Sequence, residues 1–417
     1  MGMADSRDEI NRLVLSHEEW RRRTINLIAS ENALSPAVHK ALNSDLVQRY
    51  GDYSGRDLAA RRYRGNRYIE EIEREVVRLA QETFHAKYVE LRAISGHIAG
   101  AAVLMGICRP GDLVLEPGRD AGGHREGGKF AGKNPLVQLE IGYLPFDAAR
   151  YTIDAATAIA VIRERRPKVV ILGSSNFLFQ HPVAQIADVM HKELPESVLV
   201  YDGSHVMGFL AAGRFQDPLG EGADVVFGST HKTFPGPQGG IIFSNRDDLM
   251  ERISEATYPA LVTNHHLFRL PAMGLALLEM QMWGGAYAEA IVANAQALGA
   301  ALEASGVPCV CVDGQYSRSH TLLACVSRIG KGAEIAVRLE DSGIITTAAH
   351  LPDTWGVEGL RLGVQEITRL GAQPGQMELV AHWIAQAARR ERAVEEIASE
   401  TAAFAMGLAP ACFTWAE

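Results

Sequence analysis

A lysine in a loop rich in glycine and proline is the first residue of this sequence whose type and setting could do chemistry. Lys232 lies in the segment from Gly228 to Gly240, directly after an apolar run. Its neighbours Thr230, His231 and Thr233 show no helical spacing that would place it on an exposed helix face. Such an amine can form a Schiff base with an aldehyde cofactor. A solvated surface lysine is the alternative, because lysines are normally exposed.

A carboxylate upstream of this lysine favours the cofactor interpretation. Asp202 ends the apolar run that starts at Val198, and it opens the segment Asp202-Gly-Ser-His205. Enzymes that use pyridoxal 5′-phosphate (PLP) need a carboxylate near the pyridine nitrogen, because a protonated ring accepts electrons from the substrate. Asp202 stands in the chain where that carboxylate is expected. Aspartate is also common in turns at strand ends, which is the structural alternative.

A third segment could hold a phosphate. Ser95, Gly96 and His97 begin an apolar, helix-like run that ends at Cys108. Small residues at a helix start leave backbone N–H groups for an anion, although serine there also serves as an ordinary cap. The order of phosphate loop, histidine, aspartate and lysine along the chain is more specific than any one segment.

Taken together, these segments make the sequence resemble the serine hydroxymethyltransferases, PLP enzymes of the aspartate aminotransferase fold (fold type I). The resemblance extends from about Leu27 to Gly371. The motifs that carry it are Leu27-Ile-Ala-Ser-Glu-Asn32, Gly122-Gly-His124, Thr230-His-Lys-Thr233 with Gly236-Pro237 and Gly239-Gly240, and Gly359-Leu-Arg-Leu-Gly363.

The resemblance implies a role for each matching residue. Lys232 would form the Schiff base, Asp202 would pair with the pyridine nitrogen, and His124 would stack on the ring. Arg361 would hold the amino acid carboxylate through paired hydrogen bonds, helped by Ser30. The other cofactor-binding residues that it implies are Ser95, Gly96, His97, His205, Thr230, His231, Tyr50 and Gly240. Tyr50 and Gly240 would reach the neighbouring subunit's phosphate, which implies a homodimer with shared active sites.

The sequence also departs from the family near the substrate. Asp52 stands where the family has a glutamate for proton transfer, and Tyr63 in the same loop would lie near the substrate. Arg119 and Arg125 flank Gly122-Gly-His124, where the family has leucines that enclose folate. Two further departures are Gln238 in place of an arginine and Val364-Gln-Glu366 in place of Thr-Pro-Ala. These changes resemble the L-threonine transaldolases.

We therefore expect a PLP-dependent enzyme that breaks and forms the Cα–Cβ bond of a β-hydroxy amino acid. The favoured activity is an L-threonine transaldolase that passes a glycyl unit to a larger aldehyde, such as a nucleoside aldehyde in antibiotic biosynthesis. Two alternatives stay open: a folate-dependent serine or 2-methylserine hydroxymethyltransferase, and a threonine aldolase.

The elements that position these residues follow an α/β pattern. Apolar runs at 169–173, 198–202, 224–228 and 240–243 predict strands, and residues 182–193 predict a helix between two of them. This alternation indicates a mostly parallel sheet covered by helices, with ligands at the carboxyl ends of its strands. A helix at 285–305, strands at 309–312 and 321–326 and a helix at 332–341 predict a smaller α+β domain. We expect an N-terminal arm (1–35), a large PLP-binding domain (36–284) and a small domain (285–417).

Composition limits the partners. The formal net charge of −9 argues against nucleic acid as a partner. The five cysteines fit no zinc pattern, so we expect free thiols, no metal and a cytoplasmic location. No apolar run is long enough to span a bilayer.

Overall fold

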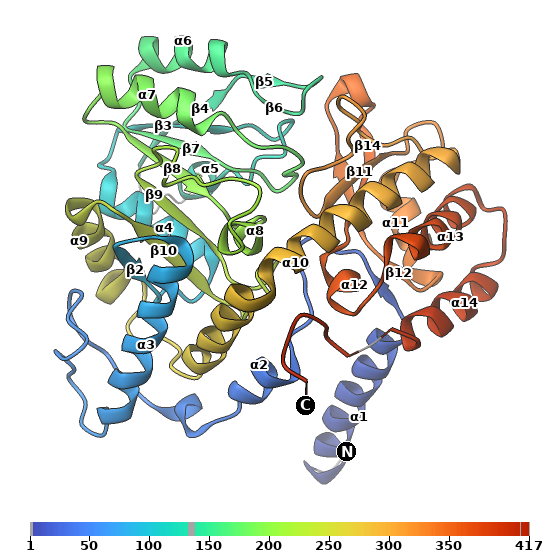
Figure 1. Ribbon diagram of the computed structural model, residues 1–417, viewed down its shortest axis with the longest axis horizontal. Helices are drawn as coiled ribbons and strands as arrows, with labels where there is room; N and C mark the ends of the chain where they lie inside the picture. The colour runs from blue at the N-terminus through green and yellow to red at the C-terminus, as the bar shows by residue number, and fades with distance from the viewer. Residues whose placement is uncertain (1–2, 132–137, 409, 417) are drawn as a thin grey trace. The chain divides into compact units, whose positions relative to one another are not determined.

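The computed structural model describes residues 3–131, 138–408 and 410–416, and the chain divides into two compact units (Figure 1). The larger unit comprises residues 30–292, 317–320 and 413–417, and the smaller one comprises residues 1–29, 293–316 and 321–412. Helix α10 (Arg269–Ala304) contributes to both units. The domain limits expected at residues 35 and 284 stay predictions.

A seven-stranded sheet forms the centre of the larger unit. Its order is β2 (Tyr88–Glu90), β10 (Gly240–Ser244), β9 (Val225–Ser229), β8 (Val198–Asp202), β7 (Val169–Leu172), β3 (Leu113–Pro117) and β4 (Glu140–Leu144). Strands β9 to β4 are parallel, whereas β10 is antiparallel to both of its neighbours. The expected α/β class with a mostly parallel sheet is confirmed.

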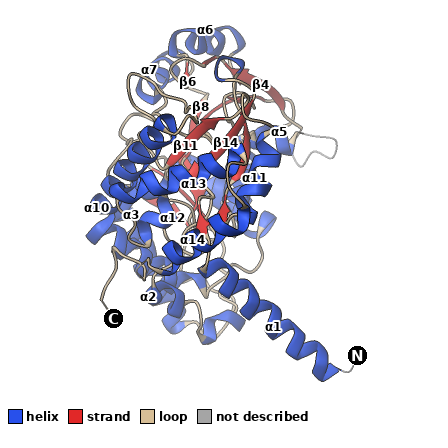
Figure 2. Ribbon diagram, turned by 90° about the vertical axis from the view of Figure 1, so that its right-hand side faces the viewer, coloured by secondary structure: helices blue, strands red, loops and turns tan. Residues whose placement is uncertain are grey.

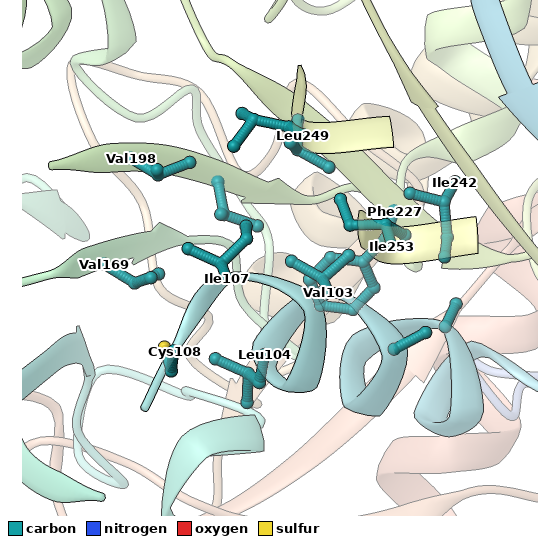
Figure 3. Close-up of a cluster of buried hydrophobic side chains, with 14 of the residues drawn as sticks. Val103, Leu104, Ile107, Cys108, Val169, Val198, Phe227, Ile242, Leu249 and Ile253 are labelled. Atoms are coloured by element: carbon teal, nitrogen blue, oxygen red, sulfur yellow. The ribbon is translucent and has the colours of Figure 1, made fainter. Parts of the chain in front are cut away.

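Both faces of this sheet are covered. On one face, Val103 and Ile107 of α4 (Gly96–Ile107) pack with Val198, Phe227 and neighbouring apolar side chains (Figure 3). Helix α9 (Asp247–Glu255) closes the same cluster. The alternate β8 residues Leu199 and Tyr201 point to the opposite face, and both are fully buried. The sheet is therefore buried on both faces. Its strands are held firmly enough for the polar groups at their ends to keep fixed positions.

Shorter elements complete the larger unit. They are α2 (Pro36–Ala41), η1 (Asp45–Gln48), α3 (Arg67–Phe84), α5 (Glu126–Phe130), the hairpin of β5 (Phe146–Asp147) and β6 (Thr152–Ile153), α6 (Ala155–Arg165), α7 (Val183–Glu193), α8 (Met207–Ala211) and η2 (Ala256–Leu261). Helix α5 is short, but it carries two side chains of the candidate site, Glu126 and Lys129.

The smaller unit has an antiparallel sheet of β11 (Thr321–Cys325), β14 (Glu358–Gly363) and β13 (Thr347–His350). Strand β1 (Ile25–Asn26) pairs in parallel with β12 (Ile344–Ile345). The helices are α1 (Met3–Arg22), α11 (Gly332–Asp341), η3 (Asp353–Trp355), α12 (Gln365–Arg369), η4 (Pro374–Gln376), α13 (Met377–Arg389) and α14 (Val394–Met406). Figure 2 shows α1 as one unbroken helix leading from the N-terminus. None of the helices in the described ranges could cross a membrane.

Two sequence predictions need correction. The helix expected from residue 285 begins at Arg269. The strand expected at 309–312 is wrong: Cys309 makes an isolated bridge to Ala324, and Val312 closes a turn through Asp313 and Gly314, which both have positive φ. The cysteines are free, as expected, but only Cys108 and Cys309 are buried.

Candidate active site

The loop that carries Lys232 follows β9 and is closed by its own hydrogen bonds. Thr230 donates from Oγ1 to the Pro237 carbonyl oxygen at 2.6 Å and from its backbone N–H to Gly239 at 3.1 Å. Gly240 packs so closely on Ser95 that a Cβ atom would collide with the Ser95 carbonyl oxygen. The lysine loop is therefore rigid and abuts the expected phosphate loop.

Two further side chains hold this loop. Asn32 donates from Nδ2 to the Lys232 carbonyl oxygen at 2.6 Å, and it lies 3.0 Å from the hydroxyl group of Tyr287. Thr233 donates from Oγ1 to the His205 carbonyl oxygen at 2.9 Å. The loop after β8 and the loop after β9 are therefore tied together. The anchoring role of Asn32 was not anticipated from the sequence, which marked only the motif that contains it.

The phosphate loop is the N-terminus of α4. Ser95 caps this helix, because its Oγ atom accepts a hydrogen bond from the Ile98 N–H at 3.1 Å. The N–H groups of the first helical turn have no partner within a helix, and those of Gly96 and His97 belong to this turn. Gly96 is buried against Ser229, with no room for a side chain. The amides available for an anion thus lie beside the end of β9.

Asp202 and His205 are buried at the carboxyl end of β8. Asp202 accepts a hydrogen bond from the Ser204 N–H through Oδ1 at 3.0 Å, and its Oδ2 atom is 3.9 Å from His124 Nδ1. The His205 ring stacks on His320 with centroids 5.7 Å apart. The predicted acid and the predicted ring-stacking histidine therefore lie close together.

His124 contacts two residues that sequence reasoning missed. Its Nδ1 atom is 2.8 Å from Glu126 Oε2, and its Nε2 atom is 2.5 Å from Lys129 Nζ. The other carboxylate oxygen of Glu126 lies 2.8 Å from His97 Nδ1. Burial alone would raise the pKa of Glu126, but the contacts with His124 and His97 outweigh it and lower that pKa. A charged residue two positions after His124 was the only sequence signal.

His231 precedes the lysine and has a buried Nδ1 atom with no hydrogen-bond partner among the described residues. Burial, and then the charges of Lys232 and Arg269, lower the pKa of His231 to about 4, so its ring is neutral at pH 7. This donor set fits PLP: an amine for the aldehyde, a buried carboxylate for the pyridine nitrogen, helix amides for the phosphate and an unsatisfied ring nitrogen at the lysine loop.

The tyrosine-rich loop is more open. Tyr50 and Tyr63 are exposed, and their ring centroids are 5.3 Å apart. Asp52 is buried, and its Oδ1 atom has no hydrogen-bond partner in the described part of the chain. Burial raises the pKa of Asp52, against the opposing charges of His265 and Arg62. The structure therefore brings the rings of the two tyrosines together.

Arg119 and Arg125 lie in the segment between β3 and α5, on either side of Gly122-Gly-His124. Both are exposed, and neither forms an ion pair within the described ranges. Arg125 adopts a positive φ of 55° as it enters α5. Ser30 is half-buried, two residues before Asn32.

Arg361 belongs to the smaller unit. It is the fourth residue of β14, the central strand of the three-stranded sheet, where it stands opposite Leu323 and Thr347. Burial lowers the pKa of its guanidinium group. A half-buried arginine on a rigid central strand suits the paired recognition of a carboxylate.

The fold and this donor set define a PLP-dependent transferase of fold type I. The family model for serine hydroxymethyltransferase matches residues 3–384. The chain therefore belongs to the serine hydroxymethyltransferase family, and PLP is its cofactor.

Similar proteins carry two different names. A serine hydroxymethyltransferase from Methanopyrus kandleri is 41% identical over 394 residues, covering 93% of this chain and 90% of the relative. One from Pyrococcus abyssi is 40% identical, covering 92% and 91%. Among solved structures, an L-threonine transaldolase from Pseudomonas fluorescens in its internal aldimine state has a TM-score of 0.90 and 29% identity. That match covers 99% of this chain and 94% of the other.

Proposed function

We propose that this enzyme is an L-threonine transaldolase, which cleaves threonine and passes the glycyl unit to a larger aldehyde. The observation that carries the proposal is the pair of exposed arginines, Arg119 and Arg125, on either side of Gly122-Gly-His124. In the family, leucines at these positions enclose the flat ring of folate. Burying an aromatic ring between apolar side chains is favourable by about 25 cal/mol per Å², and two exposed guanidinium groups do not offer that slot. They suit an acceptor with oxygen-rich or anionic groups.

The roles proposed for the other residues are those that membership of the family implies. PLP, once bound, supplies the electron sink that stabilises the Cα carbanion. Lys232 holds the cofactor aldehyde, and Asp202 keeps the pyridine nitrogen protonated. Arg361 and Ser30 fix the substrate carboxylate. Holding the carboxylate decides which Cα bond of the substrate stands perpendicular to the pyridine ring and is therefore broken. Asp52 is the proposed proton-transfer group of the tyrosine-rich loop, and burial raises its pKa above the ordinary value of an aspartate.

A serine hydroxymethyltransferase is the second candidate, because the relatives at 40–41% identity carry that name. Those relatives are more similar in sequence than the transaldolase of known structure, at 29%. The two activities share the cofactor chemistry and differ in the group that receives or delivers the carbon unit. The altered residues beside His124 and after Arg361 favour the transaldolase.

The proposal extends to assembly and context. Tyr50 and Gly240 would complete the neighbouring subunit's phosphate site, so we propose a homodimer in which Tyr50, exposed in the single chain, becomes covered. A nucleoside aldehyde in antibiotic biosynthesis would meet the need for an oxygen-rich acceptor. A cytoplasmic location is consistent with five free cysteines.

The test is a screen of the purified enzyme with L-threonine and a panel of aldehydes, read by mass spectrometry. A transaldolase produces a new β-hydroxy amino acid with the acceptor's carbon skeleton and releases acetaldehyde. If acetaldehyde is released at the same rate with and without each added aldehyde, and no new amino acid forms, the enzyme is instead a threonine aldolase.

A further inference from the structure

The carboxylate of Glu126 lies between two histidine rings from separate segments. One oxygen is 2.8 Å from His97 Nδ1, the other is 2.8 Å from His124 Nδ1, and the side chain is 2% exposed. The lowered pKa of Glu126 keeps the group ionised at neutral pH, and an ionised carboxylate accepts hydrogen bonds but donates none. Nδ1 is therefore the nitrogen of each ring that lies within donating distance of this carboxylate.

The backbone fixes where this carboxylate can lie. Glu116, buried in β3, accepts hydrogen bonds from the N–H groups of Gly127 and Gly128, both at 2.9 Å, and so anchors the first turn of α5. On the opposite side, Gly100 of α4 leaves the space that the carboxylate occupies, because a Cβ atom there would lie 2.6 Å from Glu126 Oε1. The position of Glu126 is thus set by both helices.

The far side of His124 determines which ring nitrogen can donate. Lys129 Nζ is 2.5 Å from His124 Nε2. An ammonium group has only donors, so Nε2 accepts and carries no proton. The ring nitrogen of His124 that can donate is therefore Nδ1. Lys129 also belongs to α5, so one short helix supplies the groups at both ring nitrogens.

Two carboxylates stand within reach of that single N–H group. His124 Nδ1 is 2.8 Å from Glu126 Oε2 but 3.9 Å from Asp202 Oδ2. Asp202 Oδ1 already accepts a hydrogen bond from Ser204, which makes Oδ2 the oxygen left for the cofactor. Without the Glu126 carboxylate, the His124 N–H group would turn to Asp202 and compete with the pyridine nitrogen.

We propose that Glu126 is a positioning residue that holds the His124 N–H group and thereby keeps Asp202 available to the pyridine nitrogen of PLP. This role does not depend on the acceptor, because it concerns the cofactor alone. It can therefore be tested independently of the transaldolase proposal. The effect of replacing Glu126 is measured with both threonine and serine as substrates.

The main test compares Glu126→Gln with Glu140→Gln, an exposed residue of the same unit. The glutamine amide cannot accept from both histidines. We expect kcat to fall about 10- to 100-fold on either substrate, the range found when a carboxylate that orients a metal-bound histidine is removed. PLP should also dissociate more readily, with a dissociation constant about tenfold higher, while KM stays within about threefold. Equal kcat and PLP affinity in the two variants would overturn the proposal.

Two further variants separate positioning from general damage. In Lys129→Met, His124 Nε2 has no lysine beside it and can carry the ring proton. Nδ1 can then accept a hydrogen bond from the amide introduced by Glu126→Gln, and it has no proton to donate to Asp202. In that background we expect Glu126→Gln to cost less than about threefold in kcat. The same cost with and without Lys129 would contradict the mechanism. Gly100→Ala keeps every ionisable group but displaces the carboxylate. If Glu126→Gln fails to fold, unchanged PLP affinity in Gly100→Ala would overturn the proposal.

Discussion

Asn32 Nδ2 donates a hydrogen bond of 2.6 Å to the backbone carbonyl oxygen of Lys232, joining positions 200 residues apart in the chain. The motif that contains Asn32 and the lysine loop thus form one local structure. The bond fixes the backbone of Lys232 through its carbonyl group and does not involve the side-chain amine that must form and release a covalent bond. It also places the lysine in the same local structure as Tyr287.

Lys232 should be the only residue that retains the cofactor covalently after borohydride reduction. The reason is its position in the closed loop after β9, beside the N-terminus of α4. Peptide mapping of the reduced wild type should place the modification on Lys232, and Lys232→Ala should show none. Modification of any other lysine would remove the basis for the site.

The Asp202→Asn variant should still bind PLP but should be nearly inactive. An amide cannot stabilise the positive charge of a protonated pyridine ring, so the electron sink weakens. We expect kcat to fall by at least about a hundredfold, which corresponds to about 3 kcal/mol of barrier. Turnover and bound PLP are measured on the same preparation. Activity within about threefold of wild type would show that Asp202 is a turn residue at a strand end.

Arg361→Lys should raise the KM for threonine by about tenfold or more, because lysine keeps the charge but cannot form paired hydrogen bonds. Arg328→Lys is the matched control, since Arg328 is exposed in the same unit. Steady-state kinetics compare the two. An unchanged KM in Arg361→Lys would assign the carboxylate site to another residue.

Glu73 should make the protein sensitive to acid. It is buried with Arg61 at 2.7 Å and His265 at 3.3 Å. Burial opposes ionisation, but His265 and Arg61 outweigh it and lower the pKa of Glu73 to about 2. Because the folded pKa lies below the unfolded value, the stabilisation is complete above about pH 4.5 and is lost as the pH falls towards 2. It is on the order of 3 kcal/mol.

Denaturant unfolding from pH 7 to pH 2 measures this effect. Glu73→Gln should be less stable at pH 7, because it removes the carboxylate that pairs with the buried Arg61 charge, and its stability should fall less between pH 4.5 and 2. Glu71→Gln, exposed on the same helix, should behave like the wild type. Parallel stability curves for Glu73→Gln and the wild type would contradict the assignment.

The sequence predicted the parts of this structure that depend on local pattern. The strand that ends at Asp202 and the helix that begins after Ser95 lie where the apolar runs placed them. Glu126 and Lys129 escaped prediction because their contacts depend on how α5 turns back towards His124, starting from the positive φ of Arg125. The expected strand at 309–312 failed for a related reason: alternation cannot reveal that Asp313 and Gly314 turn the chain.

The most direct test of the account compares two pairs of substrates on the wild-type enzyme. One reaction contains threonine with increasing concentrations of an oxygen-rich aldehyde, and the other contains serine with increasing tetrahydrofolate. The account predicts that the aldehyde accelerates threonine consumption and appears in a new β-hydroxy amino acid, whereas tetrahydrofolate does not change the rate of serine cleavage. Acceleration of serine cleavage by micromolar tetrahydrofolate, with no response to any aldehyde, would contradict it and identify a hydroxymethyltransferase.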